Sequence, residues 1–325
     1  MKKALITGIT GQDGVYLADF LLKKGYSVVG AFRRTSHKSL ERLEIFDLIN
    51  KVELIKMDLG DQISINKTIK SVQADEIYNL AAQSFVGASF DQPLLTTTVN
   101  GLGALGIFEA AKEFSPHSKI YQASSSEMFG NSNEIKNEDT RLFPASPYGI
   151  SKVFAHKTAQ HYREAYNMFI ACGILFNHES PVRGLEFVTR KITSTLVRIK
   201  AHKRNKLILG NIKAKRDWGF AGDYVQAMWL MLQQDKPTDY VIATGKSHSV
   251  EDFLEKSFEY AGIKNWKDYV EISNQLMRPH DIDNLVGDAS KAEKELGWKP
   301  TMTYEELIKL MVDSDQKLFE KDPFY

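Results

Sequence analysis

The stretch Ala4-Leu5-Ile6-Thr7-Gly8-Ile9-Thr10-Gly11-Gln12-Asp13-Gly14 decides the fold. Its first four residues predict a buried strand, its three evenly spaced glycines predict a tight turn, and residues 15–24 carry apolar side chains at helical spacing. Glycines in such a turn let backbone N–H groups approach a phosphate, while the helix N-terminus points at the phosphate charge. The GxxGxxG spacing, in this strand–turn–helix context, predicts a dinucleotide site.

Short apolar runs alternate with helical patterns through the first half of the chain. The predicted strands are residues 4–7, 27–32, 52–56, 76–79, 119–123 and 169–175. The predicted helices are residues 16–24, 63–72, 101–113 and 147–166. This alternation predicts an α/β fold with a doubly wound parallel sheet.

The pattern changes after Phe176. A basic, loop-rich stretch runs through Arg216, a helix is predicted near residues 224–234, and an apolar strand at 240–243. We expect residues 240–244 to return to the main sheet. The domains then interleave: residues 1–176 and about 217–248 form the cofactor domain, and residues 177–216 and about 249–325 form a smaller C-terminal α/β substrate lobe.

Composition excludes several classes of protein. The chain has 325 residues, 43% of them apolar, with 42 basic and 41 acidic side chains. This balance predicts no nucleic-acid partner. The predicted first strand begins at Lys3 and no apolar run approaches the roughly 20 residues of a membrane span, so we expect a cytoplasmic protein without a membrane partner.

Cys172 is the single cysteine, so no disulfide can form within the chain. It lies in the apolar run 169–175, where a buried and inert thiol is expected. We assign no metal-ligating residues.

Two arginines follow the predicted second strand, in Phe32-Arg33-Arg34-Thr35-Ser36. An NAD site would place an acidic side chain here to bind a ribose hydroxyl, whereas two guanidiniums suit the 2′-phosphate of NADP. The pair predicts NADP over NAD; the alternative is a solvated basic loop.

Later strands end in residues that suit the same cofactor. Asp58 and Leu59 follow the third strand and could reach adenine, with a solvated loop as the alternative. Asn79-Leu80-Ala81-Ala82-Gln83-Ser84 ends the fourth strand with small residues that allow close approach, with tight packing as the alternative.

The pair Tyr148 and Lys152 lies on one face of the predicted helix 147–166, because the two residues are four apart. A neighbouring ammonium favours the phenolate, so Tyr148 could act as a base. Ser125 and Glu127 follow the fifth strand, on the same edge of the sheet. The predicted catalytic residues are Ser125, Glu127, Tyr148 and Lys152. The predicted cofactor-binding residues are Gly8, Thr10, Gly11, Gln12, Asp13, Gly14, Arg33, Arg34, Asp58, Leu59, Leu80, Ala81, Ala82, Ser84, Tyr148 and Lys152.

This tyrosine–lysine pair, an upstream serine and the opening GxxGxxG together resemble the extended short-chain dehydrogenase/reductase family, with its Rossmann fold. Longer motifs are similar to those of the GDP-mannose 4,6-dehydratases within it, from residue 4 to about 312. They are residues 8–14, 79–84, 122–127, 174–181, 187–191 and 214–219.

The resemblance implies roles in a sugar-nucleotide 4,6-dehydratase. Tyr148 takes the proton of the sugar 4-hydroxyl while a hydride passes from C4 to NADP, and Lys152 holds the cofactor ribose. Glu127 removes the C5 proton, water leaves from C6, and hydride returns to C6. Many family members have threonine at the position of Ser125, and serine keeps the hydroxyl, so we expect activity.

The resemblance also implies residues that grip the GDP part of the substrate: Asn177, Lys191, Arg216 and Arg278. For Arg278, taken together with Asp281 and Asp283, surface charge is the alternative. His178 is expected to be packed or hydrogen-bonded, and Arg190 is ambiguous between the site and solvent.

The run Val182-Arg183-Gly184-Leu185-Glu186 departs from the commoner family pattern and leaves the sugar open between GDP-mannose and GDP-D-glycero-D-manno-heptose. An NADP-linked epimerase or reductase is the enzymatic alternative, which Glu127 disfavours. A non-catalytic NADP-binding regulator would be expected to lack the catalytic residues. The basic loop 33–42 resembles a segment through which family subunits meet, which implies a homo-oligomer, dimer or tetramer.

Overall fold

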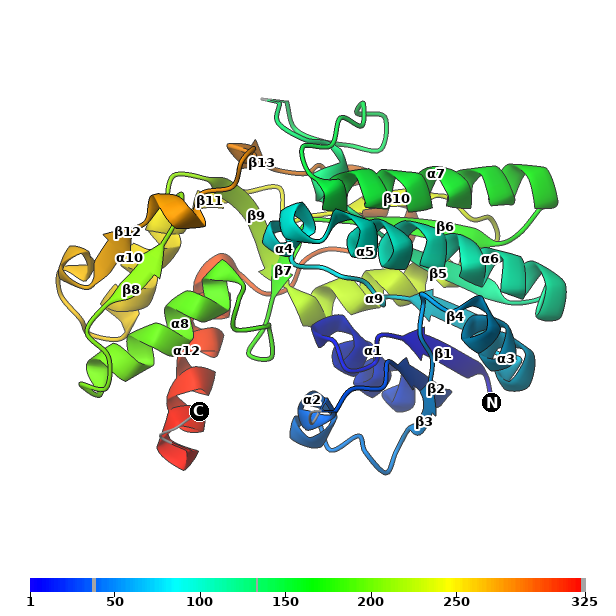
Figure 1. The fold of residues 1–325 in the computed structure, drawn as a ribbon, viewed down its shortest axis with the longest axis horizontal. Coiled ribbons are helices and arrows are strands. Elements are labelled where there is room, and N and C mark those ends of the chain that lie inside the picture. Colours follow the sequence, from blue (N-terminus) through cyan, green and yellow to red (C-terminus); the bar gives the residue numbers. More distant parts are fainter. Residues whose placement is uncertain (37–38, 133, 323–325) are drawn as a thin grey trace.

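The computed structural model describes residues 1–36, 39–132 and 134–322. In this part of the chain, seven strands form one parallel sheet (Figure 1). In spatial order they are β10 (Asp239–Ile242), β6 (Ile170–Leu175), β5 (Lys119–Ser125), β4 (Glu76–Asn79), β1 (Lys3–Thr7), β2 (Ser27–Phe32) and β3 (Glu53–Lys56). Every neighbouring pair is parallel, which confirms the predicted doubly wound α/β fold.

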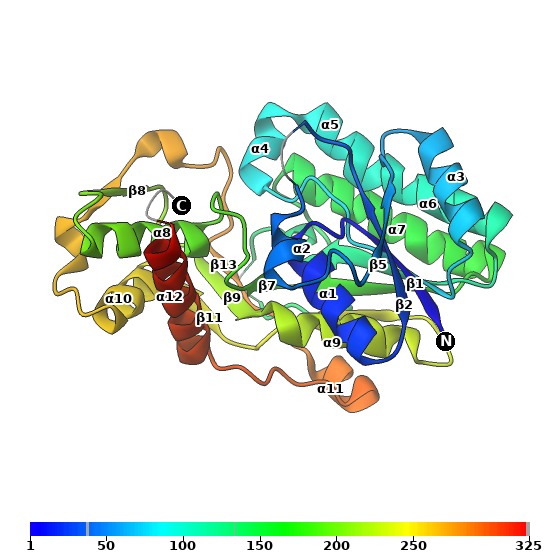
Figure 2. The same cartoon turned by 90° about the horizontal axis from the view of Figure 1, so that it is seen from below.

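Helices cover both faces of the main sheet (Figures 1 and 2). On one face, α3 (Gln62–Val72), α6 (Gly103–Phe114) and α7 (Pro147–Tyr166) bury their apolar side chains against the strands. On the other face, α1 (Gln12–Lys23), α9 (Ala221–Leu232) and α11 (Ser290–Leu296) form a second core, beside the short α2 (Glu41–Ile45). The first helix begins earlier than predicted, because Gly11 already adopts the extended N-cap conformation.

One continuous helical stretch differs from expectation. Residues Pro93–Phe114 comprise α5 (Pro93–Thr97), a π-helical turn (Thr98–Leu102) and α6, and follow the short α4 (Val86–Asp91). By length and composition this stretch could cross a membrane: an 18-residue segment of it has a mean hydropathy of 1.2, and 56% of that segment is buried inside the protein. The sequence analysis missed it because polar residues interrupt the apolar run. Its buried face packs on the main sheet through Ile107 and Phe108, as a core helix does.

A smaller lobe packs beside the carboxyl ends of these strands (Figure 2). Its strands within the described residues are β7 (Asn177–Glu179), β8 (Leu207–Leu209), β9 (Lys215–Phe220), β11 (Ser247–Ser249), β12 (Val270–Ile272) and β13 (Asn284–Leu285). β9 pairs with β7, β11 and β13, while β8 pairs with β12. Its helices α8 (Val188–Lys200), α10 (Val250–Tyr260) and α12 (Tyr304–Lys321) enclose a separate apolar core. Short 3₁₀ turns span Ser126–Met128, Trp266–Asp268 and Asn274–Leu276.

The observed layers divide the chain differently from the expected boundaries. The strand expected at residues 240–244 does return to the main sheet, as β10. Residues 217–248 were expected to belong to the cofactor domain. Within them, however, β9 and β11 pair in the sheet of the smaller lobe, and Trp218 is buried in the core of that lobe. Residues 177–216, expected to be rich in loops, contain the thirteen-residue helix α8.

Two junctions between the layers have almost no linker. Phe176 alone separates β6 from β7, and its N–H donates to the carbonyl of Ile242 at 3.0 Å. At the second junction, β9 ends at Phe220 and α9 begins at Ala221. Phe176 and Ala221 are both buried. At these two crossings the chain therefore passes between main sheet and smaller lobe through packed residues.

Candidate active site

The glycine-rich turn is built so that only glycine fits at its key positions. Gly8 has a φ of +71°, and a Cβ there would lie 2.8 Å from the Cα of Ala81. A Cβ on Gly14 would lie 2.4 Å from the carbonyl oxygen of Gly8. The N-cap of α1 is Gly11, which makes no side-chain capping hydrogen bond. The first-turn N–H groups of α1 therefore suit an anion.

Polar side chains lock the carboxyl ends of three neighbouring strands together. Thr7 Oγ1 donates to Asn79 Oδ1 at 2.9 Å, and Asn79 Nδ2 donates to Gln122 Oε1 at 2.8 Å. Thr7 Oγ1 also accepts the N–H groups of Leu80 and Ala81, each at 3.0 Å. These bonds fix the small residues after β4 beside the glycine-rich turn.

Local capping places the predicted catalytic residues. Ser125 ends β5, and its Oγ accepts the N–H of Glu127 at 3.2 Å, which starts the 3₁₀ turn. Ser146 caps α7 by accepting the N–H of Gly149 at 3.0 Å, with Pro147 as the first helical residue. Tyr148 therefore lies in the first turn of α7, at the same edge of the sheet.

Tyr148, Ser125 and Glu127 form one interacting group. The Ser125 hydroxyl favours ionisation of the Tyr148 phenol and lowers its pKa, whereas the Glu127 carboxylate lies close enough to disfavour a second negative charge there and raises it. Burial is the largest influence and raises the pKa of Tyr148 to about 12. All three residues are buried.

Lys152 differs from expectation in its effect on Tyr148. Its ammonium donates to the carbonyl of Ala123 at 2.8 Å and lies 5.8 Å from the centre of the Tyr148 ring. Burial lowers the pKa of Lys152 to about 8. Burial of Tyr148 is the dominant influence on its phenol and raises its pKa, opposite in direction to the effect expected of a neighbouring ammonium.

A cavity of about 790 Å³ lies between the main sheet and the smaller lobe. The predicted residues that line it are Gly8, Thr10, Gly11, Gln12, Asp13, Gly14, Arg33, Asp58, Leu59, Leu80, Ala81, Ala82, Ser84, Ser125, Glu127, Tyr148, Lys152, Asn177, Lys191, Arg216 and Arg278. Arg34 is exposed and is not among the lining residues. The Asp58 carboxylate also caps its own turn, accepting the N–H of Gly60 at 2.9 Å.

The cationic side of the cavity is built mainly by the smaller lobe. Arg216 donates to the carbonyl of Ile282 at 2.7 Å and to Asp281 at 3.1 Å, so part of its guanidinium holds that segment. Arg278 lies 3.4 Å from Asp281 and 3.9 Å from Glu127 Oε1. Burial lowers the pKa of Lys191.

Sequence reasoning missed several lining residues, among them Arg42 and Arg183, whereas Asp281, considered together with Arg278, does line the cavity. Arg42 donates to the carbonyls of Val182 at 2.7 Å and Thr10 at 3.1 Å, bridging the smaller lobe and the glycine-rich turn. The sequence predicts Arg33 and Arg34 as cofactor ligands and the loop 33–42 as a subunit contact, and no local pattern indicates that Arg42 bridges two segments. Residues 37 and 38 of that loop lie outside the described residues.

His178 is packed and hydrogen-bonded, as expected. Its ring lies 4.6 Å from that of Tyr224, and its two nitrogens face Asp13 and the carbonyl of Phe176. Arg190 belongs neither to solvent nor to the cavity lining. It forms a buried ion pair with Asp315, with 2.6 Å between Arg190 NH2 and Asp315 Oδ1.

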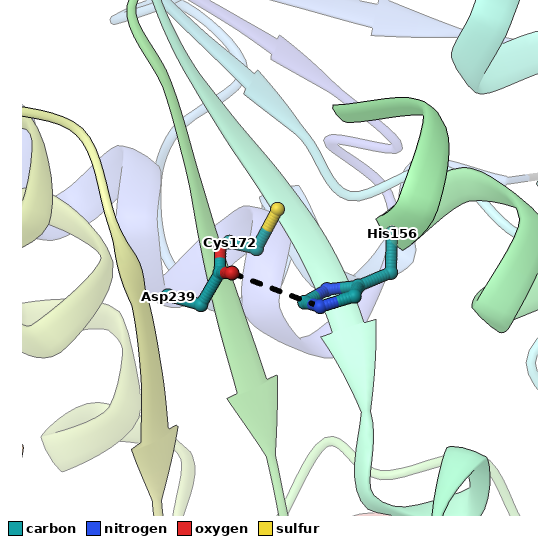
Figure 3. A group of neighbouring side chains, drawn as sticks. All are labelled: His156, Cys172 and Asp239. Carbon is teal, nitrogen blue, oxygen red and sulfur yellow. Dashed lines mark ion pairs between the residues drawn. The ribbon is translucent and has the colours of Figure 1, made fainter. Parts of the chain in front are cut away.

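His156 on α7, Cys172 on β6 and Asp239 on β10 place potential metal ligands within 4.8 Å of one another (Figure 3). The donor set does not fit a metal. Arg163 already pairs with Asp239, and His156 Nδ1 is hydrogen-bonded to Ser124 Oγ at 2.9 Å. Burial raises the pKa of the Cys172 thiol well above its usual range. Among the described residues this is a packed polar group, and Cys172 is buried and free as expected.

The chain resembles known proteins over nearly its whole length. Residues 5–311 match the family model described as GDP-mannose 4,6 dehydratase. The protein GDP-mannose 4,6 dehydratase 2 of Arabidopsis thaliana is 53% identical over 331 residues, covering 99% of this chain and 88% of the relative.

Solved structures share the fold at lower identity. A dTDP-glucose 4,6-dehydratase from Bacillus anthracis, in complex with NAD, superposes with a TM-score of 0.85 at 23% identity and covers 98% of each chain. RMD from Pseudomonas aeruginosa, complexed with NADPH, gives a TM-score of 0.81 at 20% identity, covering 98% of this chain and 100% of its own. The family model and the full-length relative show that this chain belongs to the GDP-mannose 4,6-dehydratase family.

Proposed function

We propose that this protein is an NADP-dependent hydro-lyase that converts GDP-mannose to GDP-4-keto-6-deoxymannose. The observation that carries the proposal is the position of Glu127. It lies beside Ser125 and Tyr148 in one cavity and carries a carboxylate where an epimerase or reductase needs no second base. Removal of the C5 proton is a separate acid–base event and requires such a group.

The cofactor site fits an NADP dinucleotide. Glycine at positions 8 and 14 lets the turn pack tightly against Ala81 and against its own backbone, and the uncapped start of α1 supplies N–H donors and a favourable dipole for a diphosphate. Arg33 lines the cavity after β2 and would hold the 2′-phosphate, with Arg34 next to it in the chain. The oxidised nicotinamide, when bound, supplies the acceptor that takes a hydride from C4 and gives it back at C6.

The chain's own residues move the protons. Tyr148 accepts the proton of the 4-hydroxyl, and the Ser125 hydroxyl stabilises the oxygen at C4 by hydrogen bonding. The ammonium of Lys152, 5.8 Å from the centre of the Tyr148 ring, would favour the phenolate, which burial disfavours. Glu127 then removes the C5 proton, which the 4-keto group has made acidic, and returns it to the 6-hydroxyl, which leaves as water while a C5=C6 double bond forms. When hydride has returned to C6, C5 takes up a proton, which balances the one that Tyr148 took from the 4-hydroxyl.

The smaller lobe would hold the GDP part. Lys191, Arg216 and Arg278 supply the positive charge for a diphosphate, and Asn177 lies where β7 enters the lobe. We assign the main sheet and its helices to the cofactor and the smaller lobe to the nucleotide sugar.

Products distinguish the candidate reactions. We expect purified protein incubated with GDP-mannose to form a product lighter by one water, without net consumption of NADPH, as followed by mass spectrometry and absorbance. A product of unchanged mass would indicate an epimerase, and stoichiometric consumption of NADPH a reductase; either would overturn the proposal.

The sugar is tested separately, because the run 182–186 differs from the commoner pattern. A parallel incubation with GDP-D-glycero-D-manno-heptose shows which of the two sugars the enzyme converts faster. Competing titrations with NADP and NAD test the cofactor choice, which equal affinities would overturn.

We also propose that the enzyme is cytoplasmic and self-associates. Large apolar side chains are exposed on three neighbouring elements: Leu94 on α5 (83% exposed), Leu102 on the π-helical turn (51%), and Ile150 (56%) and Phe154 (42%) on α7. These elements pack side by side. A second copy of the chain would remove this surface from water.

A further inference from the structure

The imidazole of His178 has a hydrogen-bond acceptor at each nitrogen. Nδ1 lies 2.7 Å from the carbonyl oxygen of Phe176, and Nε2 lies 2.8 Å from Oδ2 of Asp13. A carbonyl oxygen and an ionised carboxylate accept hydrogen bonds and cannot donate them. Both contacts are satisfied only when both ring nitrogens carry a proton, so the geometry favours an imidazolium.

The charges around the ring agree with this state. Burial opposes a charged imidazole, but the carboxylate of Asp13 and its hydrogen bond outweigh it and raise the pKa of His178. Burial likewise opposes ionisation of Asp13, yet His178 holds the pKa of that carboxyl below its usual value. Arg183 faces both groups, Lys152 and Tyr121 lie within the field of Asp13, and Tyr224 stacks on the ring.

Asp13 lies where an unpaired carboxylate would interfere with cofactor binding. It is in the first turn of α1 and lines the cavity with Gly8 and Gly11. The N-terminus of a helix attracts a diphosphate, whereas a bare carboxylate at the same place repels one. The positive charge of His178 cancels that repulsion.

Neighbouring hydrogen bonds also join the turn that contains Asp13 to the strand that contains His178. Gln12 Nε2 donates to the carbonyl oxygen of His178 at 3.0 Å, and Ser180 Oγ donates to Gln12 Oε1 at 2.7 Å. Together with the Asp13–His178 pair, these bonds join the cofactor turn to β7 and the residue that follows it. The contacts lie at the boundary between the main sheet and the smaller lobe.

We propose that His178 is a positioning residue: a buried imidazolium that cancels the charge of Asp13 and fixes the cofactor turn against the smaller lobe, so that the dinucleotide is retained between turnovers. The inference rests on the cofactor role proposed above. It assigns the ion pair a purpose besides packing.

A double-mutant cycle on NADPH binding tests the proposal. His178→Gln leaves the Asp13 carboxylate uncompensated, so we expect about tenfold or more weaker binding of NADPH, measured by fluorescence titration. Asp13→Asn, alone and combined with His178→Gln, completes the cycle: the double variant lacks the repelling charge and should bind NADPH more tightly than His178→Gln alone, by about threefold or more. The control His161→Gln changes an exposed histidine on α7 and should bind as the wild type does.

Equal weakening in the single and double variants would show that His178 only packs, and would overturn the inference. Absence of NADPH binding by the wild type would instead overturn the proposed function. Should the variants fail to fold, ¹⁵N NMR of histidine-labelled wild type remains decisive. Protonated Nδ1 and Nε2 near neutral pH support the proposal, and a neutral tautomer contradicts it.

Discussion

Glu127 is proposed to act on the C5 proton of the sugar and not to hold the cofactor. A change at Glu127 should therefore reduce dehydration without weakening cofactor binding. Glu127→Gln keeps the size and the hydrogen bond from Glu127 N to Ser125, but it removes the base for the C5 proton. We expect kcat to fall by about 10²–10⁴-fold, the usual range for loss of a general base. Product formation by mass spectrometry and NADPH titration measure the two properties. Unchanged turnover would remove Glu127 from the mechanism.

The buried ammonium of Lys152 should lower the free energy of unfolding, although the reaction requires it. Because burial lowers its pKa from 10.5 to about 8, its charged form is disfavoured in the folded protein. Lys152→Met should therefore abolish activity but raise the free energy of unfolding of the cofactor-free protein, by about 1–3 kcal/mol near neutral pH. Urea denaturation measures this gain, and Lys157→Met, at an exposed position on the same helix, should change stability by less than about 0.5 kcal/mol.

The gain from Lys152→Met should depend on pH. Between pH of about 8 and 10.5, the unfolded chain still binds the proton that folded Lys152 has lost, so wild-type stability from this group rises with pH. The advantage of the variant should shrink across this window. An advantage that is constant with pH would contradict the role of buried charge.

The helices α8 and α12 are joined by a buried ion pair. Arg190 and Asp315 are each 2% exposed, and Thr193 Oγ1 also donates to Asp315 at 2.6 Å. Removing one partner strands the other charge, so Arg190→Met should destabilise the fold by about 3–5 kcal/mol. Chemical denaturation measures this loss, which the double variant Arg190→Met/Asp315→Leu should reduce.

A matched control uses an exposed pair. Lys23 and Asp19 lie 2.6 Å apart on the surface of α1, and Lys23→Met should cost no more than about 0.5 kcal/mol. Similar losses for Arg190→Met and Lys23→Met would show that burial of the pair does not matter.

The elements of the main sheet were predictable because their apolar runs and glycines have local causes. The helix α8 was not, since its sequence, with Thr189, Thr193, Ser194 and Thr195, has weak intrinsic helix propensity. Contacts with α10 and α12 in the lobe's own core stabilise this helix. Likewise the helix Pro93–Phe114 begins eight residues before its predicted start at residue 101. The added residues include Thr96, Thr97 and Thr98, and threonine has a weak intrinsic preference for helix.

Self-association belongs to the scale of the whole molecule. If a second copy covers the exposed apolar side chains of α5 and α7, Ile150→Glu combined with Phe154→Glu should convert the oligomer into a monomer. Size-exclusion chromatography with light scattering measures the mass. Lys157→Glu, on the same helix, should leave it unchanged, and a wild-type monomer would refute the proposal.

The same scale explains which site residues could be predicted. The carboxyl ends of parallel strands meet at one edge, so motifs after β1, β4 and β5 could be placed together from the sequence. The link between Asp13 and His178 joins residues 165 positions apart and depends on how the lobe docks. Arg42 is similar: its bonds to Thr10 and Val182 exist only once three segments have packed.

The junctions at Phe176 and Phe220–Ala221 have a consequence for how new specificities arise. The chain also crosses between the layers through loops at residues 243–246, 286–289 and 297–303, but the two junctions that have no loop consist of buried residues and tie the smaller lobe directly to the main sheet. We therefore expect crystal structures with and without ligands to superpose as one rigid body. Evolution, or an engineer, would have to alter sugar preference by substitution in the cavity walls, such as residues 182–186, and not by retuning a closure motion.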